Sequence, residues 1–547
     1  MIPSSRLLRA PIASGSRQLL STPAPTAVAA LAKQCRPAST TSLPSASTTG
    51  SAGTSGSSAT VTTLPNKMRV VTESTPGHFH AVGVYIDAGS RFETRERSGV
   101  SHLIDRLAFK STDKHSDTEM TTLIDSLGSQ ISCASSRETI MYQSSIFPHH
   151  LPTALSILSS TILHPLLLPA EIESQKQAAA YEIREIWSKP ELILPEVLHT
   201  VAYRDNTLGM PLLCPEEQLG VLGEKEVRGF MDEWYRPERM VLAGSGMAHE
   251  ELVELGERYF GGLKPEVAAT PDVYAPVTGA GGGKEPQSLG RKSFATVSAA
   301  PVDGAHERLA SQRAVYTGGE EYIEKPEEEF VHLYIGFEGL GIHDPDIYAL
   351  ATLQTLLGGG GSFSAGGPGK GMYTRLYTSV LNRYHAVDFC QAFHHCYVDS
   401  GLFGISAAVY PKFAPRIAEV IAQQLHALTG PMRGGLEEVE VSRAKNMLKS
   451  TLVMALESRL TAVEDLGRQT QVHGNKVPVE EMCAKIDALT MDDLWRTAKR
   501  IVRPASGPSG LNFGLGSGKP TIVAQGKNLE TLGDVKRVLK RWDLGVQ

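Results

Sequence analysis

A glycine-rich segment at residues 358–371 constrains this chain more than any other feature. Its sequence is GGGGSFSAGGPGKG, in which eight of fourteen residues are glycine, and it directly follows an apolar, helix-like run at residues 347–357. Glycine loses more backbone entropy on ordering than any other residue. A folded domain therefore keeps so many glycines together where the backbone must move or must lie very close to another molecule. A flexible surface loop has the same composition and is the alternative interpretation.

The glycine-rich segment does not match a phosphate-binding loop. A P-loop has glycine, four residues and then Gly-Lys-Ser/Thr, between a strand and a helix. Here Lys370 is followed by Gly371, Ser364 stands where the first glycine should be, and a helix precedes the segment. No G-x-G-x-x-G register fits either. The sequence therefore argues against a nucleotide-binding enzyme.

Length and charge indicate a large chain with a distinct N-terminus. The 547 residues suffice for two or more domains, and no apolar run approaches the ~20 residues of a membrane span. Of 53 basic and 59 acidic residues, seven basic ones and no acid lie in residues 1–72, which leaves a net charge of −13 for the remainder. The Ser-, Ala- and Arg-rich start is typical of a mitochondrial transit peptide, with a generic disordered tail as the alternative. Residues 38–63 are expected to be a disordered spacer.

The cysteines give no sign of a disulfide framework or a metal site. Six occur, at Cys35, Cys133, Cys214, Cys390, Cys396 and Cys483. Cys35 falls in the expected transit peptide, and the remaining five form an odd, scattered set that fits a reducing compartment such as the mitochondrial matrix. Cys390, His394, His395 and Cys396 form a cluster in sequence. Strand alternation is expected to divide these side chains between two faces, so we predict no metal there.

The secondary-structure pattern predicts an α+β fold with an internal repeat. Expected strands are at residues 70–73, 81–88, 131–134, 140–147 and 240–243, and expected helices are at 100–109, 118–127, 169–202 and 250–260. Glycine, proline, serine and alanine dominate residues 270–319, which predicts a linker or insertion. After it, YIGFEG from Tyr334 echoes YIDAG from Tyr85, each before a turn and a helix. The echo predicts two homologous domains.

We therefore expect five regions. The expected boundaries are 1–60 for transit peptide and spacer, 61–269 for an N-terminal domain, 270–325 for the linker, 326–525 for a C-terminal domain and 526–547 for a C-terminal helical tail.

A damaged metal motif lies on the first expected helix. His102, Asp105 and Arg106 stand at positions i, i+3 and i+4, which share one helical face. Inverted zinc peptidases have H-x-x-E-H at this spacing, with two histidines on zinc and a glutamate that activates the zinc-bound water. Here the acid is shortened and an arginine replaces the second ligand. Arginine stays cationic and cannot bind Zn²⁺.

A second helix supports this interpretation over an amphipathic helix with a chance histidine. Glu182 lies 76 positions after Arg106, on the kind of later helix that carries the third zinc ligand of such peptidases. We expect Arg106 to pair with Glu182, so that an ion pair replaces the metal.

Three further segments make a family resemblance specific. They are residues 358–385, YTGGE at 316–320 and LESRLTAVEDLGRQ at 456–469. The chain resembles the pitrilysin-type inverted zinc metallopeptidases over about residues 61–525 outside the linker, and within them the heterodimeric processing peptidases of mitochondria. In these enzymes a β subunit carries the intact zinc site. The α subunit carries a degenerate site and a glycine-rich loop that helps to bind the presequence. The long linker and the tail after Pro504 depart from the pattern.

The resemblance implies an α-type subunit with no catalytic residue and no cofactor of its own. Its implied partners are a zinc-containing β subunit and the basic, amphipathic presequences of precursors imported into the matrix, which the acidic balance of the mature chain suits. The implied substrate-binding positions are Gly358, Gly359, Gly360, Gly361, Ser362, Phe363, Gly366, Gly367, Gly369, Lys370, Gly371, Glu440, Glu464 and Asp465. Solvated helix charge is the alternative explanation for Glu464 and Asp465, which are adjacent on an expected helix.

Two other functions compete with this interpretation. Core subunits of the respiratory cytochrome bc1 complex share the fold and have broken zinc sites, but as a rule lack the glycine-rich loop. A self-sufficient zinc protease is disfavoured by Arg106 and by the absence of H-x-x-E-H or H-E-x-x-H elsewhere in the sequence. Association with an inner-membrane respiratory complex stays open.

Overall fold

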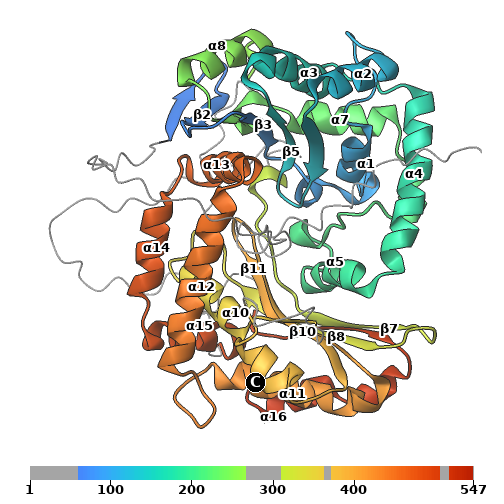
Figure 1. Cartoon of the computed structure of the whole chain (residues 1–547). Coiled ribbons are helices and arrows are strands. Elements are labelled where there is room, and N and C mark those ends of the chain that lie inside the picture. Colours follow the sequence, from blue (N-terminus) through green and yellow to red (C-terminus); the bar gives the residue numbers. More distant parts are fainter. Residues whose placement is uncertain (1–58, 266–308, 362–370, 505–516, 546–547) are drawn as a thin grey trace, which may run out of the picture.

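The chain folds into two halves that are stacked one above the other (Figure 1). The structure is a computed structural model, and it describes residues 59–265, 309–361, 371–504 and 517–545. We call residues 59–265 the first half and the described residues from 309 onwards the second half. Each half is built on a six-stranded sheet packed with helices. The predicted α+β class with two homologous domains is confirmed.

The first sheet has the strand order β1-β2-β6-β3-β5-β4. Strands β2 and β6 are parallel, and the other neighbours are antiparallel. Its strands are β1 (Thr60–Thr63), β2 (Arg69–Glu73), β3 (His80–Ile86), β4 (Gln130–Ser135), β5 (Ile140–Ile146) and β6 (Met240–Ser245).

The second sheet repeats this arrangement with the order β7-β12-β8-β11-β10-β9. Its strands are β7 (Gly319–Glu324), β8 (Val331–Gly339), β9 (Gly359–Gly361), β10 (Val387–Cys396), β11 (Gly401–Val409) and β12 (Thr521–Gly526). Strands β7 and β12 are parallel, and the other neighbours are antiparallel. Without β1 and β9, the two sheets therefore have the same order and the same directions. The echoed residues Tyr85 and Tyr334 lie on β3 and β8, which are equivalent strands.

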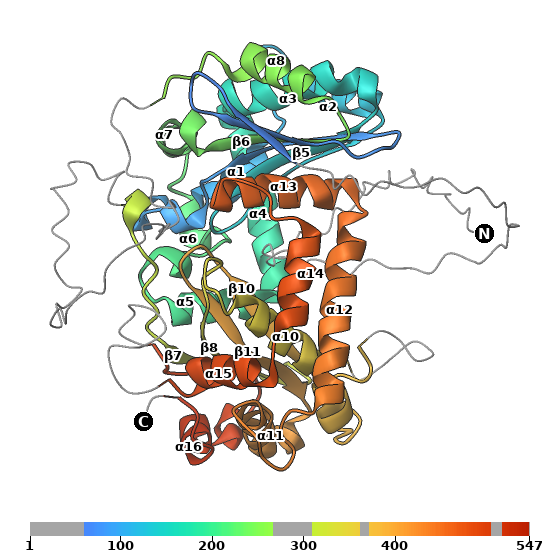
Figure 2. The same ribbon diagram turned by 90° about the vertical axis from the view of Figure 1, so that its left-hand side faces the viewer.

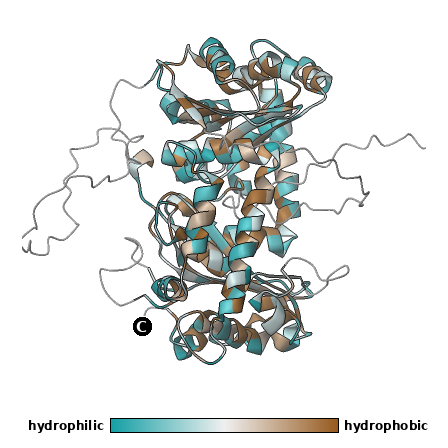
Figure 3. Ribbon diagram, turned by 60° about the vertical axis from the view of Figure 1, so that its left-hand side comes forward, coloured by the Kyte–Doolittle hydropathy of each residue, from teal (hydrophilic) through white to brown (hydrophobic). Residues whose placement is uncertain are grey.

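Helices cover the outer face of each sheet and form the two main hydrophobic cores. In the first half these helices are α1 (Val100–Leu107), α3 (Leu151–Leu163), α7 (Glu224–Trp234) and α8 (His249–Phe260). In the second half they are α10 (Ile347–Leu357), α11 (Ala414–Ala427), α15 (Met491–Val502) and α16 (Val535–Arg541). Helix α2 (Asp117–Leu127) packs on α3 in a smaller cluster. Hydrophilic and hydrophobic stretches alternate along the helices, both on the outer faces and between the sheets (Figure 3).

The long helices between the two sheets also follow the repeat. They are α4 (Pro169–Trp187) with α5 (Pro190–Ala202), and α12 (Glu438–Leu456) with α13 (Arg459–His473), followed by α14 (Val479–Ala488). The region 169–202, expected as one helix, is divided at Ser188 and Lys189. Pro190 begins the new helix because proline lacks the N–H that would continue the old one.

The two halves exchange a helix. Leu194 and Leu198 of α5 pack on the second sheet, whereas Val463 and Leu466 of α13 pack on the first sheet. Figure 2 shows α13 directly beneath the first sheet. Gly467 permits this approach, since a Cβ there would lie 2.2 Å from the Tyr85 ring. The two sheets are thus held together by helices that cross between them.

A membrane-spanning helix would have to be both long and apolar. None of the helices in the described part of the chain is long and apolar enough to cross a bilayer.

Candidate functional site

The degenerate metal motif forms an ion pair between α1 and α4. Arg106 Nη1 lies 3.2 Å from Glu182 Oε2, and His102 Nε2 lies 3.7 Å from the same oxygen. The Glu182 side chain is 7% exposed. A buried carboxylate needs a positive partner, and here the guanidinium of Arg106 supplies it. The ion pair predicted from the sequence is therefore present.

The surroundings of His102 are also the reverse of a zinc site. The backbone N–H of Cys214 donates to His102 Nδ1 at 3.2 Å. Nδ1 is therefore the acceptor, and the neutral ring carries its proton on Nε2, which faces Glu182. A zinc-bound histidine instead uses one nitrogen as ligand and donates the other N–H to an acceptor. The residues present therefore do not fit Zn²⁺. Arginine replaces one ligand, and the Cys214 N–H bonds the His102 nitrogen that would have to donate to an acceptor in a zinc site.

Asp105 turns away from Glu182 and towards the edge strand β4. Its Oδ2 accepts hydrogen bonds from the Ser135 backbone N–H at 2.9 Å and from Ser135 Oγ at 3.3 Å. Burial raises the pKa of Asp105, and the Ser135 hydrogen bonds oppose that shift. The shared face predicted for the motif brings His102 and Arg106 together, whereas the short Asp105 side chain is engaged by the sheet.

Sequence reasoning missed Glu93, which holds the start of α1. Its carboxylate accepts from the backbone N–H groups of Gly99 at 2.6 Å and Ser101 at 2.9 Å, and from Ser101 Oγ. Burial raises the pKa of Glu93 to about 7. Glu93 stands six residues before Gly99, outside the spacing of a capping box, so helix-start rules could not identify it.

The first part of the glycine-rich segment is a strand. Gly359–Gly361 form β9, which pairs with Phe389, Cys390 and Gln391 of β10. A flexible loop is thus the wrong description for these three residues. Backbone geometry explains the glycines: a Cβ on Gly359 (φ 93°) would lie 2.0 Å from the Cys390 carbonyl oxygen. The predicted positions Ser362, Phe363, Gly366, Gly367, Gly369 and Lys370 lie outside the described residues.

Two side chains fix the described ends of this segment. Thr374 Oγ1 accepts from the Gly359 N–H at 3.1 Å and donates to the Gly371 carbonyl at 2.6 Å. Tyr377 Oη donates to the Gly361 carbonyl at 2.9 Å. Both ends therefore start from one rigid base at the edge of the second sheet.

The three predicted acidic positions do not form one cluster. Glu440 lies in the first turn of α12 and pairs with the buried Arg375. Glu464 and Asp465 lie on α13, beyond the far end of α12, a helical length of about 24 Å from Glu440. Glu464 Oε1 is 3.5 Å from Arg468 Nη1. Asp465 accepts from Gln469 Nε2 at 2.8 Å, and burial raises its pKa.

The histidines and cysteines of β10 divide less evenly than expected. Cys390, His394 and Cys396 share one buried face, and only His395 of the four points to the other. Burial lowers the pKa of His394 to about 4 and that of His395 to about 3, so both rings are neutral near pH 7. Within the described ranges, no group of three or more His, Cys, Asp or Glu residues is arranged to hold a metal ion.

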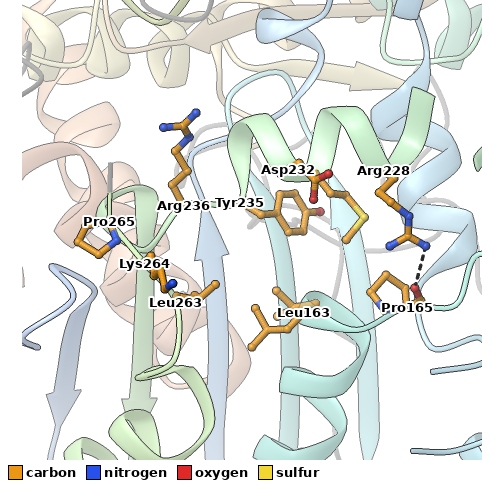
Figure 4. Close-up of a pocket in the computed structure, with 11 residues that line it drawn as sticks. Leu163, Pro165, Arg228, Asp232, Tyr235, Arg236, Leu263, Lys264 and Pro265 are labelled. Atoms are coloured by element: carbon orange, nitrogen blue, oxygen red, sulfur yellow. Dashed lines mark hydrogen bonds between the residues drawn. The ribbon is translucent and has the colours of Figure 1, made fainter. Parts of the chain in front are cut away.

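The structure has a cavity of about 460 Å³ in the first half, separate from the predicted positions. Leu163, Tyr235 and Leu263 line it, and Arg228 Nη2 donates to the Pro165 carbonyl at 3.4 Å at its rim (Figure 4). None of its lining residues belongs to the degenerate motif or to the glycine-rich segment.

Comparison with known proteins places the chain in a family. Residues 69–216 match insulinase (peptidase family M16), and residues 222–448 match the peptidase M16 inactive domain. The chain therefore belongs to peptidase family M16, which confirms the predicted resemblance to inverted zinc metallopeptidases.

Its relatives within the family are more specific. The chain is 45% identical over 529 residues to mitochondrial-processing peptidase subunit alpha of Neurospora crassa, covering 89% of this chain and 90% of that protein. It is 34% identical over 479 residues to the subunit of the same name from Bos taurus, covering 85% and 81%. A chain of complex III2 from Candida albicans has a TM-score of 0.66 at 19% identity, covering 89% of this chain and 100% of that one. That last likeness shows the fold alone.

Proposed function

We propose that this chain is the non-catalytic, substrate-recognition α subunit of a mitochondrial processing peptidase. It binds the presequences of imported precursors, and a zinc-containing β subunit cleaves them. The observation that carries the proposal is the Arg106–Glu182 ion pair, which stands between α1 and α4 in place of a metal. The described ends of the glycine-rich segment and the names of the relatives support the same role.

The charge of the chain suits a basic substrate. The net charge after residue 72 is −13, and a field of one sign attracts an oppositely charged partner from a distance. We assign the chain to the mitochondrial matrix, with residues 1–60 as a transit peptide and spacer. N-terminal sequencing of the native protein should find a new start within about residues 40–60, whereas an intact Met1 would contradict this assignment.

The central experiment measures presequence binding in the assembled α–β pair. The β partner is made zinc-free so that no cleavage occurs, and residues 362–370 are replaced by a short Ser-Gly linker, which leaves β9 and Thr374 in place. The dissociation constant of a fluorescent presequence peptide should rise at least about tenfold, or ~1.4 kcal/mol. Assembly with β should persist. Unchanged affinity, with normal cleavage by the zinc-loaded pair, would overturn the binding role.

Two further measurements test the subunit assignment. Metal analysis of the purified chain should find no stoichiometric zinc, because arginine cannot be a ligand. Purification from mitochondria should bring down a homologue that carries H-x-x-E-H. Recovery with respiratory-complex subunits in its place would support the core-subunit alternative, for which the fold likeness to complex III2 by itself gives no preference.

A further inference from the structure

A cavity of about 320 Å³ lies beside the glycine-rich segment, and the degenerate metal motif makes no use of it. It opens between α10 and α12, which correspond in the repeat to α1 and α4 of the first half. Its lining includes Leu356, Tyr373, Thr374, Arg443, Ala444 and Met447. We call it the Tyr373 pocket.

The pocket has an apolar floor and one open aromatic wall. Leu356 and Ala444 are buried, at 3% and 2% exposure, whereas Tyr373 is 65% exposed. Met447, a further lining residue, is half-buried. Ligand sites usually measure about 300–1,000 Å³. A cavity at the lower end of this range holds one or two side chains of a peptide.

The charged groups of the pocket disfavour a cationic side chain. Glu440 is the counter-ion of Arg375, whose Nη atoms also donate to the carbonyls of Gly434 at 2.8 Å and Gly435 at 2.6 Å. Arg443 adds a second positive charge at the rim, with its guanidinium 6.0 Å from the centre of the Tyr373 ring. Among the described residues of the lining, the one acid, Glu440, is already paired with Arg375, and Arg443 is the one cation. These charges favour an uncharged side chain over an arginine.

The pocket is joined to the glycine-rich segment through Thr374. This residue lines the cavity, and its hydroxyl bonds both Gly359 and Gly371. Gly371 is itself part of the wall. The pocket and strand β9 are therefore connected through one side chain, Thr374.

We propose that the Tyr373 pocket binds an aromatic or branched aliphatic side chain from the apolar face of the presequence. The proposal rests on the proposed function and adds to it a contact that recognises an apolar side chain of the presequence instead of a charged one. Basic residues of the same peptide point away from the pocket, towards acids elsewhere on the α–β pair.

The test uses the full chain with zinc-free β and fluorescent amphipathic peptides that carry arginine and leucine. Tyr373→Ala and Met447→Ala should each raise the dissociation constant at least about fivefold, as expected for loss of an apolar anchor. Tyr181→Ala is the matched control, since Tyr181 is 67% exposed on α4; it should change the constant less than about twofold.

Peptide variants identify which side chain enters the pocket. Each leucine is changed to alanine and each arginine to glutamine. One leucine change should add little further loss in the Tyr373→Ala chain, because the two changes remove the same contact. Arginine changes should weaken binding equally in both chains.

The outcomes separate this proposal from the function on which it rests. If the unmodified pair binds no presequence peptide, the proposed function fails. If it binds, and replacement of residues 362–370 weakens binding, the function stands. In that case, the pocket proposal alone would be overturned if the dissociation constants for Tyr373→Ala and Met447→Ala both stayed within about twofold of that of the unmodified chain. Thermal unfolding of each variant shows that it is folded.

Discussion

The two halves of this chain share one topology and differ where a short helix packs on a 19-residue helix. Between α1 and α4 the space is closed by Arg106 and Glu182. Between α10 and α12 it holds a cavity with an apolar floor. The same framework thus gives a closed, charged contact in one half and an open, apolar contact in the other. Side chains at this helix pair, and not the fold, decide what each half can bind.

The two sheets also differ at the edge strand next to this helix pair, which is more open in the second half. The first sheet ends at β4, where Ser135 binds Asp105. The second sheet adds β9, three glycines held by Thr374 and Tyr377. An edge without side chains lets a peptide backbone approach closely. At its outer edge strand, the second half is therefore open to a peptide backbone in a way that the first half is not.

Removing the arginine that pairs with a glutamate of each 19-residue helix tests the comparison most strongly. Arg375→Gln leaves Glu440 without its charge partner, and we expect the free energy of unfolding to fall by about 3–5 kcal/mol. Arg106→Gln should cost less, because the Arg106 side chain is 35% exposed and water can replace part of the contact. Denaturant unfolding measures both. Adding Glu440→Gln to Arg375→Gln should recover part of the loss. A larger loss in the free energy of unfolding for Arg106→Gln than for Arg375→Gln would contradict this prediction.

Glu93 should make the stability of the first half depend on pH. Its pKa is raised from 4.5 to about 7 in the folded chain. The folded state therefore holds the proton more tightly, and this contribution is complete below pH 4.5 and is lost as pH rises through 7. Compared with the Glu93→Gln chain, the unmodified chain should lose on the order of 3 kcal/mol of its free energy of unfolding as the pH rises from 4.5 to about 7. Denaturant unfolding at a series of pH values tests this, and a pH-independent difference between the two chains would contradict it.

Much of the fold followed from local pattern, since the repeat was visible at Tyr85 and Tyr334. The ion pair was also accessible, because helical spacing placed Arg106 on one face and a second helix supplied Glu182. The exchange of α5 and α13 was not, because the pattern of apolar residues in a helix does not say which sheet it will cover. Only tertiary packing selects the partner. Strand β9 was hidden for another reason: glycine is depleted in strands, so its composition predicts a loop.

The acidic positions show a different limit. The family resemblance, and not the sequence pattern, pointed to Glu440, Glu464 and Asp465 as contacts for substrate arginines. The structure gives Glu440 a buried cation, Arg375, which lies 65 residues away in the chain. An ion pair of this sequence separation leaves no periodic signal. The cationic partner of an acidic side chain can therefore be identified only in the folded structure.

Substitution within β9 should have an intermediate effect. Gly359→Ala places a Cβ 2.0 Å from the Cys390 carbonyl oxygen, at a φ of 93°. We expect about 1–3 kcal/mol of local destabilisation, seen as faster amide exchange at Ala392, whose N–H donates to the Gly358 carbonyl. Gly361→Ala is the matched control, since a Cβ there meets nothing within 4 Å. Equal exchange in the two variants would show that β9 is not held as described.

The smallest effect is expected at the two neighbouring acids of α13, where the halves meet. Glu464 and Arg468 are 25% and 27% exposed and 3.5 Å apart, so Glu464→Gln should change the free energy of unfolding by less than about 0.5 kcal/mol. Its weakly held carboxylate can still attract a presequence arginine, and we expect the dissociation constant to rise about twofold to threefold at low salt.

Asp465→Asn provides the comparison for that measurement. Asp465 is half-buried and accepts a hydrogen bond from Gln469 Nε2 at 2.8 Å, so its carboxylate is engaged within α13. The Asp465→Asn chain should bind the presequence peptide as the unmodified chain does. The difference between the two variants should vanish at about 1 M salt, where the screening length falls to about 3 Å. Weaker binding by the Asp465→Asn chain than by the Glu464→Gln chain would show that the hydrogen bond to Gln469 does not select between neighbouring acids on this helix.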